Sequence, residues 1–244
     1  MANLTQLKML EELDGFLLVD KPVGIAFSTI VKAVKRKFNL VKVGHGGSLD
    51  AMASGLFVLL INDANKFVGD VMGADRSYVG TMKLGLRTNT HDVHGEAVKG
   101  NSDACPPVGE ALKNVESVLP DFKGDIFQTE PRFCSIRKEG SADYEIADTG
   151  EHKQFLTHVY RFQVGAAEGE KVPFEVSGTK SLLVKTLVND LGEALGCGAS
   201  LESLRRTRIG KFSVDEAIPF ERILSTEFGD FSSLVMPLGE ALRR

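Results

Sequence analysis

Apolar positions along the chain fall into short runs and alternating stretches, which predicts a fold with several β-strands. The run at 15–19 ends at an Asp-Lys-Pro turn, and a second buried run occupies 57–61. Residues 78–86 alternate between apolar and other side chains, which is the period of a half-buried strand. Further strands are predicted at 126–136 and 155–164.

Other segments carry the helical period. The first predicted helix spans 29–38, with Ser28 as its N-cap. The others are predicted at 64–72, at 108–118, at 187–195 with its end at Gly196 or Gly198, and from Ser200 through Leu204. Helices and strands do not follow a βαβ alternation. We therefore expect the α+β class, with a mixed, largely antiparallel sheet and flanking helices.

Composition restricts the class of protein. The chain has 244 residues, of which 43% are hydrophobic and 25% charged, as in soluble globular proteins. The longest apolar run, 56–61, is too short to span a bilayer, and the N-terminus lacks a signal-peptide pattern. The three cysteines are far apart, which indicates neither a zinc site nor a disulfide framework. We expect a cytoplasmic protein without a membrane partner.

The charge is unevenly distributed. Residues 21–90 hold ten Lys and Arg against four Asp, a formal charge of +6, although the whole chain carries −4. A basic segment of this kind suits an anionic partner, but a run such as 32–37 is also typical of a solvated helix face. A second basic cluster comprises Arg205, Arg206, Arg208 and Lys211. It either contacts phosphates, or forms a solvated strand edge or pairs with Glu193 and Glu202.

The most unusual stretch is the glycine-rich segment 44–50, Gly-His-Gly-Gly-Ser-Leu-Asp. Its glycine density predicts a shaped loop that a ligand can approach closely. It is not a phosphate loop, because no GxxxxGK[ST] pattern occurs. Asp50 at its end is either a carboxylate acting on an anionic substrate or a turn residue that bonds its own backbone. His91 and His94 raise the alternative of a metal pair, but no third ligand is placed by spacing, so no metal is expected.

The glycine loop and its surroundings closely resemble the TruB-type pseudouridine synthases. Their signature GHxGTLDPxAxGxL stands here as GHGGSLDAMASGL at 44–56, preceded by GFLLVDKP at 15–22. Further matches occur at 64–66, 76–78, 85–95, Gln128 with Pro131, 144–145, 190–192, 195–197 and 204–206. The resemblance covers residues 15 to about 215.

The resemblance implies isomerisation of a uridine in RNA to pseudouridine, usually uridine 55 in the T-arm loop of tRNA, without a cofactor. It implies Asp50 as the nucleophile and Tyr78 as the ring that stacks on the flipped base. Lys185 matches the family arginine that pairs with the catalytic aspartate. The residues matched to substrate or site contacts are Gly44, His45, Asp92, Lys21, Lys66, Arg205 and Arg206, with a structural role as the alternative for Lys21 and Lys66.

Several departures from the family pattern lie near this site. Lysine at 185 keeps the charge but loses the guanidinium fork, Leu183 replaces a usual aromatic, and Ser48 and Ala51 flank Asp50 where Thr and Pro are usual. A catalytically impaired RNA-binding or RNA-folding protein on the same scaffold is therefore the alternative. We expect a catalytic domain at 1–215 and a tail at 216–244 that packs on it, too short for a full PUA domain. A monomer is the expected state.

Overall fold

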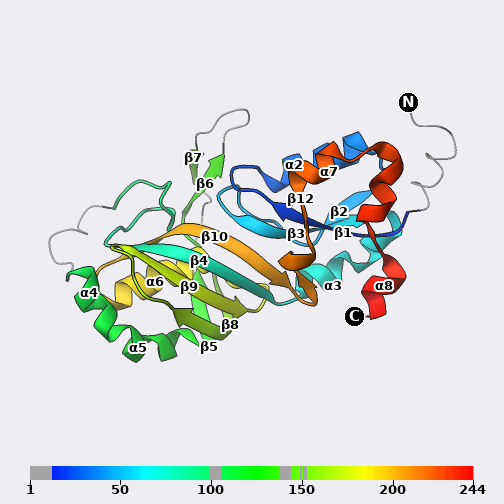
Figure 1. Cartoon of the computed structure of the whole chain (residues 1–244). Coiled ribbons are helices and arrows are strands. Elements are labelled where there is room, and N and C mark those ends of the chain that lie inside the picture. Colours follow the sequence, from blue (N-terminus) through cyan, green and yellow to red (C-terminus); the bar gives the residue numbers. More distant parts are fainter. Residues whose placement is uncertain (1–12, 99–105, 138–143, 149, 151–152, 244) are drawn as a thin grey trace. The chain divides into compact units, whose positions relative to one another are not determined.

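The computed structural model describes residues 13–98, 106–137, 144–148, 150 and 153–243 (Figure 1). The chain forms two compact units, and each is described by itself. Unit 1 comprises 1–74 with 205–244, and unit 2 comprises 75–204. Most of the loop predicted at 98–107, with Cys105, lies outside the described residues.

Unit 1 is built around β1 (Gly15–Lys21), which pairs antiparallel with β3 (Ser54–Ile61) over its whole length. β2 (Val43–His45) adds to the far side of β3, and β12 (Ile218–Pro219) and β13 (Met236–Pro237) both add to β1. The end of β10 (Ala199–Ile209) runs parallel to the start of β3 and pairs with β11 (Phe212–Ser213). At Gly55, φ is +99° and a Cβ would lie 2.3 Å from the carbonyl oxygen of Arg206, so only glycine fits this crossing.

Helices cover both faces of the β1–β3 pair. Leu17 and Val19 of β1 face α2 (Phe27–Lys37), α7 (Phe220–Ser225) and η5 (Phe228–Leu234). Phe16 and Leu18 face the opposite core, with η1 (Asn62–Phe67), α3 (Val68–Gly73), η4 (Val214–Glu216) and α8 (Leu238–Arg243). Because both faces are buried, β1 and β3 read as continuous apolar runs rather than alternating ones.

The C-terminal segment 216–244 supplies part of the unit 1 core. Phe220, Ile223 and Phe231 are buried beside Ile30 and Val34 of α2. The ring of Phe231 stacks on that of Phe38, with centroids 3.9 Å apart. This segment therefore packs on residues 13–74.

Unit 2 is an antiparallel sheet whose strands follow the order β10-β4-β9-β8-β5. These are β4 (Arg76–Leu84), β5 (Gly124–Thr129), β8 (Gln154–Val164) and β9 (Lys171–Gly178). β6 (Phe133–Arg137) and β7 (Tyr144–Asp148) form a separate hairpin. The helices are α4 (Val108–Ala111), η2 (Leu112–Asn114), α5 (Val115–Val118), η3 (Leu119–Phe122) and α6 (Val184–Ala194).

The expected mixed, largely antiparallel sheet with flanking helices is confirmed. The helix predicted from Ser200 through Leu204 is wrong, because these residues form the first half of β10. Ser28 does not cap α2, since it lies inside the helix and the N-cap is Ala26. The strand predicted at 126–136 is two strands, β5 and β6, separated at Glu130 to Arg132. No helix in the described part of the chain is long and apolar enough to span a membrane.

Candidate active site

The glycine-rich loop of unit 1 connects β2 to β3 and presents Asp50 to solvent. Gly44 and His45 belong to β2, and the loop proper begins at Gly46, whose N–H donates to the carbonyl of Val58 at 2.9 Å. Gly47 has φ +117°, a conformation that L side chains rarely adopt. Asp50 is exposed, and its carbonyl accepts a 3.1 Å bond from the N–H of Ala53. The backbone thus forms a turn at Asp50, and the residue remains exposed to solvent.

Arg206 fastens this loop from inside the protein. Its side chain is buried, and Nε donates to the carbonyl of Leu56 at 2.8 Å. The guanidinium nitrogens donate to the carbonyls of Ser48 at 2.9 Å and Gly47 at 3.4 Å. The expected phosphate contact does not fit this burial. Arg206 instead positions the segment that carries Asp50.

Lys21 holds the other side of the loop. It is fully buried, and Nζ donates to the carbonyl oxygens of Ala53 at 2.6 Å, Pro22 at 2.9 Å and Ala51 at 3.4 Å. A buried ammonium is stable only when hydrogen bonds replace its hydration. Of the two roles considered for Lys21, this geometry favours the structural one.

His45 lies beside two aromatic rings next to the loop. Its ring centroid is 5.1 Å from that of Phe27 and 5.8 Å from that of Phe57, and Nδ1 accepts a 3.3 Å bond from the N–H of Gly47. Burial, followed by the positive charge of Arg206, holds the pKa of His45 below its ordinary range. The imidazole is therefore neutral at neutral pH and offers Nε2–H as a donor.

Two other predicted contacts lie at the surface of unit 1. Arg205 makes a two-pronged pair with Asp20 at 2.9 and 2.8 Å and remains 38% exposed. Lys66 pairs with Asp63 at 2.5 Å and is 69% exposed, so it is accessible to an RNA phosphate. The alternative partners named for the basic cluster, Glu193 and Glu202, pair with Arg87 and Lys171 instead.

In unit 2, Asp92 is fully buried at the centre of a hydrogen-bonded turn. Oδ1 accepts bonds from Thr90 Oγ1 at 3.1 Å and from the N–H of His94 at 2.9 Å. The turn is bound to β10, because Leu201 donates to the carbonyl of His91 and accepts from the N–H of Val93. His91 has φ +59°, a strained value, and the two hydrogen bonds that His91 and Val93 make with Leu201 hold the turn in this conformation. A direct substrate contact, which the resemblance implied, does not fit the burial of Asp92.

Lys185 pairs with this carboxylate. Its Nζ lies 2.8 Å from Asp92 Oδ2, and only 15% of the lysine side chain is exposed. Sequence reasoning identified both residues but did not connect them, because they are far apart in the chain. The pairing of Lys185 with Asp50, which belongs to unit 1, stays a prediction.

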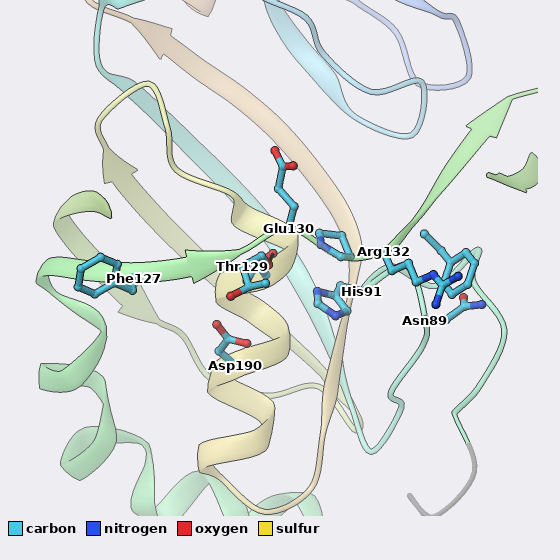
Figure 2. A pocket seen from close by; sticks show the side chains of 10 residues that line it. Asn89, His91, Phe127, Thr129, Glu130, Arg132 and Asp190 are labelled. Atoms are coloured by element: carbon cyan, nitrogen blue, oxygen red, sulfur yellow. Dashed lines mark hydrogen bonds between the residues drawn. The ribbon is translucent and has the colours of Figure 1, made fainter. Parts of the chain in front are cut away.

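Tyr78 and a pocket complete the candidate residues of unit 2. Tyr78 lies on β4 opposite Val176 and is 8% exposed. A cavity of about 460 Å³ opens between the end of β5, α6 and the turn before Asp92. Phe127 lies at one end, Thr129, Asp190 and His91 at the centre, and Asn89 with Arg132 at the other end (Figure 2). Burial raises the pKa of Asp190, although a hydrogen bond from Asn189 opposes this.

Sequence reasoning did not identify Thr88, Thr90 or Asp190 as site residues. The short polar side chains that alternate at 88, 90 and 92 were the available signal for a bonded turn. Within the described ranges, no group of three His, Cys, Asp or Glu side chains is arranged to hold a metal ion.

Comparison with known proteins shows which family the chain resembles. Residues 35–184 match the N-terminal domain of TruB family pseudouridylate synthase, and 185–243 match the C-terminal domain of tRNA pseudouridylate synthase B. A tRNA pseudouridine synthase B from Stutzerimonas stutzeri is 34% identical over 215 residues, covering 87% of this chain and 69% of the relative. One from Bordetella avium is 35% identical over 216 residues, covering 87% and 88%.

A chain in the crystal structure of a Cbf5-Nop10-Gar1 complex superposes with TM-score 0.69 at 25% identity. The match covers 96% of this chain and 63% of that one. An archaeal box H/ACA Nop10-Cbf5 complex gives 0.68 at 23% identity, which supports the fold. The fold is that of a pseudouridine synthase, and the matched residues 35–184 include the loop that presents Asp50. The chain belongs to the TruB family of these isomerases.

Proposed function

We propose that this protein isomerises uridine 55 in the T-arm loop of tRNA, with Asp50 as the nucleophile. The observation that carries the proposal is the exposed Asp50 carboxylate on a glycine loop that Arg206 and Lys21 fasten from within. A tRNA substrate is also supported by the relatives, which are named tRNA pseudouridine synthase B.

The reaction needs no external group. The bond from C1′ to N1 of uracil breaks, the base turns, and a bond from C1′ to C5 forms. The proton on C5 leaves to solvent and N1 gains one, so the atoms balance and no electron is exchanged. The target base must leave its stack, at a cost of a few kcal/mol, and we assign its stacking to Tyr78.

We assign Lys185 to pair with Asp50, with Asp92 holding the lysine in place. Thr90 and the N–H of His94 donate hydrogen bonds to Asp92 and fix its carboxylate. The ammonium of Lys185 therefore forms an ion pair with a rigid carboxylate. Lysine lacks the planar guanidinium fork with which the family arginine can make two parallel hydrogen bonds to one carboxylate. Lys185→Arg therefore tests the alternative of an impaired RNA-binding protein: an inactive wild type that gains activity would support that alternative.

The direct test is tritium release from a T-arm stem-loop that carries tritium at C5 of the target uridine. We expect release by the wild type and none by Asp50→Asn, with RNA affinity kept within a few fold. Asp70→Asn is the matched control, because Asp70 is another exposed carboxylate of unit 1. Loss of RNA binding in parallel with turnover would contradict the role of Asp50 as nucleophile.

A further inference from the structure

The pocket of unit 2 lies beside the Asp92–Lys185 pair. His91 lines it and precedes Asp92, and Thr186 lines it and follows Lys185. Its volume of about 460 Å³ falls in the range of small-molecule sites, about 300–1,000 Å³. Two of the residues that line the pocket are therefore immediate chain neighbours of Asp92 and Lys185.

Hydrogen-bond acceptors lie at the centre of this pocket. Thr186 is buried, and its hydroxyl donates to the carbonyl of Thr129 at 3.3 Å, which leaves its oxygen lone pairs to accept. Asp190 is half-buried, and its Oδ1 accepts a 3.2 Å bond from Asn189. An ionised carboxylate only accepts hydrogen bonds. A ligand that presents a hydrogen-bond donor toward Asp190 would therefore complement this carboxylate.

An aromatic ring stands at one end. Phe127 is 67% exposed on β5 and lines the pocket (Figure 2). Exposed aromatic rings beside polar groups are the usual platforms on which unstacked bases of single-stranded RNA lie. Adenine and cytosine carry an exocyclic amino group at the base edge that carboxylates recognise, guanine carries one at N2, and uracil has none.

We propose that this pocket binds a second nucleobase of the substrate RNA, one that carries an exocyclic amino group, with Asp190 as the acceptor. The inference rests on the proposed function for the identity of the RNA. It adds a requirement at a nucleotide near the target uridine, and it assigns Asp190 to substrate selection rather than to the chemistry.

The test uses stem-loops in which single nucleotides near the target lose only their amino group. Cytosine is replaced by 2-pyrimidinone, adenine by purine and guanine by hypoxanthine, one position at a time. We expect kcat/KM of the wild type to fall about tenfold at one position. In Asp190→Ala that difference should shrink to less than twofold, chiefly because activity on the amino-bearing RNA falls. Asp125→Ala, which removes an exposed carboxylate of β5, should keep the tenfold difference.

Two results would overturn the proposal: no sensitive position in the wild type, or an unchanged tenfold difference in Asp190→Ala. Thermal melts of each variant separate a selectivity change from misfolding, since a folding defect lowers activity on both RNAs equally. If no RNA releases tritium, the proposed function fails. Fluorescence anisotropy on the same RNA pairs then tests whether the pocket binds an amino-bearing base. A tenfold difference in affinity supports the proposal, and equal affinities refute it.

Discussion

Replacing Lys185 by Met removes the cation from a fully buried carboxylate. Lys185 Nζ lies 2.8 Å from Asp92 Oδ2, and Asp92 is 0% exposed. Removing one partner of a buried ion pair costs about 3–5 kcal/mol, because the remaining charge stays in a medium that solvates it poorly. We expect the free energy of unfolding of Lys185→Met to fall by this amount.

Urea denaturation of a double-mutant cycle measures the effect. Asp92→Asn in the Lys185→Met background should recover most of the loss, since a neutral amide no longer needs the cation. Lys171→Met is the matched control, because its pair with Glu202 at 2.6 Å leaves the lysine 60% exposed and should cost at most about 1 kcal/mol. A Lys185→Met protein within 1 kcal/mol of wild type, or a cycle with zero coupling, would refute the argument.

Three other predictions concern unit 1. Arg206→Gln strips the donors from two carbonyls of the Asp50 loop and one of β3, so we expect a loss of about 2–4 kcal/mol in urea denaturation and a fall in kcat larger than any rise in KM. The NMR titration of His45 should have a midpoint below 6.5, and a midpoint at or above 6.5 would contradict the burial argument. Because the unfolded chain then binds a proton more readily than the folded one, the free energy of unfolding should fall as the pH drops below 6.5. His45→Gln should abolish that part of the fall. Lys35→Ala on α2 should reduce the slope of log affinity against log salt by about one for every RNA sequence, whereas Lys113→Ala in unit 2 should leave it unchanged.

The apolar periodicity of the sequence predicted those helices and strands that have one buried face and one exposed face. α6 lies within a few residues of its predicted range because its apolar period of 3.6 residues is regular, and β8 lies close to its range although a register shift at Val159 to Arg161 interrupts its alternation. The segment from Ser200 to Leu204 was misassigned because its composition is compatible with a short capped helix. The pairing of the first half of β10 with β4 overrides that local preference.

The candidate site was predictable where its chemistry is local. The glycine loop and Asp50 stand within seven consecutive residues, so their composition marks a shaped loop, and the family resemblance then implies the role of Asp50. The roles of Arg206 and Lys21 were not predictable, because they depend on backbone carbonyls brought close only by folding. The partner of Lys185 was missed for the same reason, as Asp92 is more than ninety residues away in the sequence.

The order in which the chain is synthesised has a consequence for the unit that carries Asp50. Unit 2 is continuous from 75 to 204, whereas unit 1 is completed only by 205–244. β1 is synthesised before unit 2, but its partners β12 and β13, and the core residues Phe220 and Phe231, are synthesised after unit 2. Contacts this distant in sequence are slow to form, so unit 2 should fold first on the ribosome. The loop that carries Asp50 would then acquire its Arg206 anchor only after unit 2 has been synthesised, so a shorter nascent chain would lack the hydrogen bonds that fasten this loop.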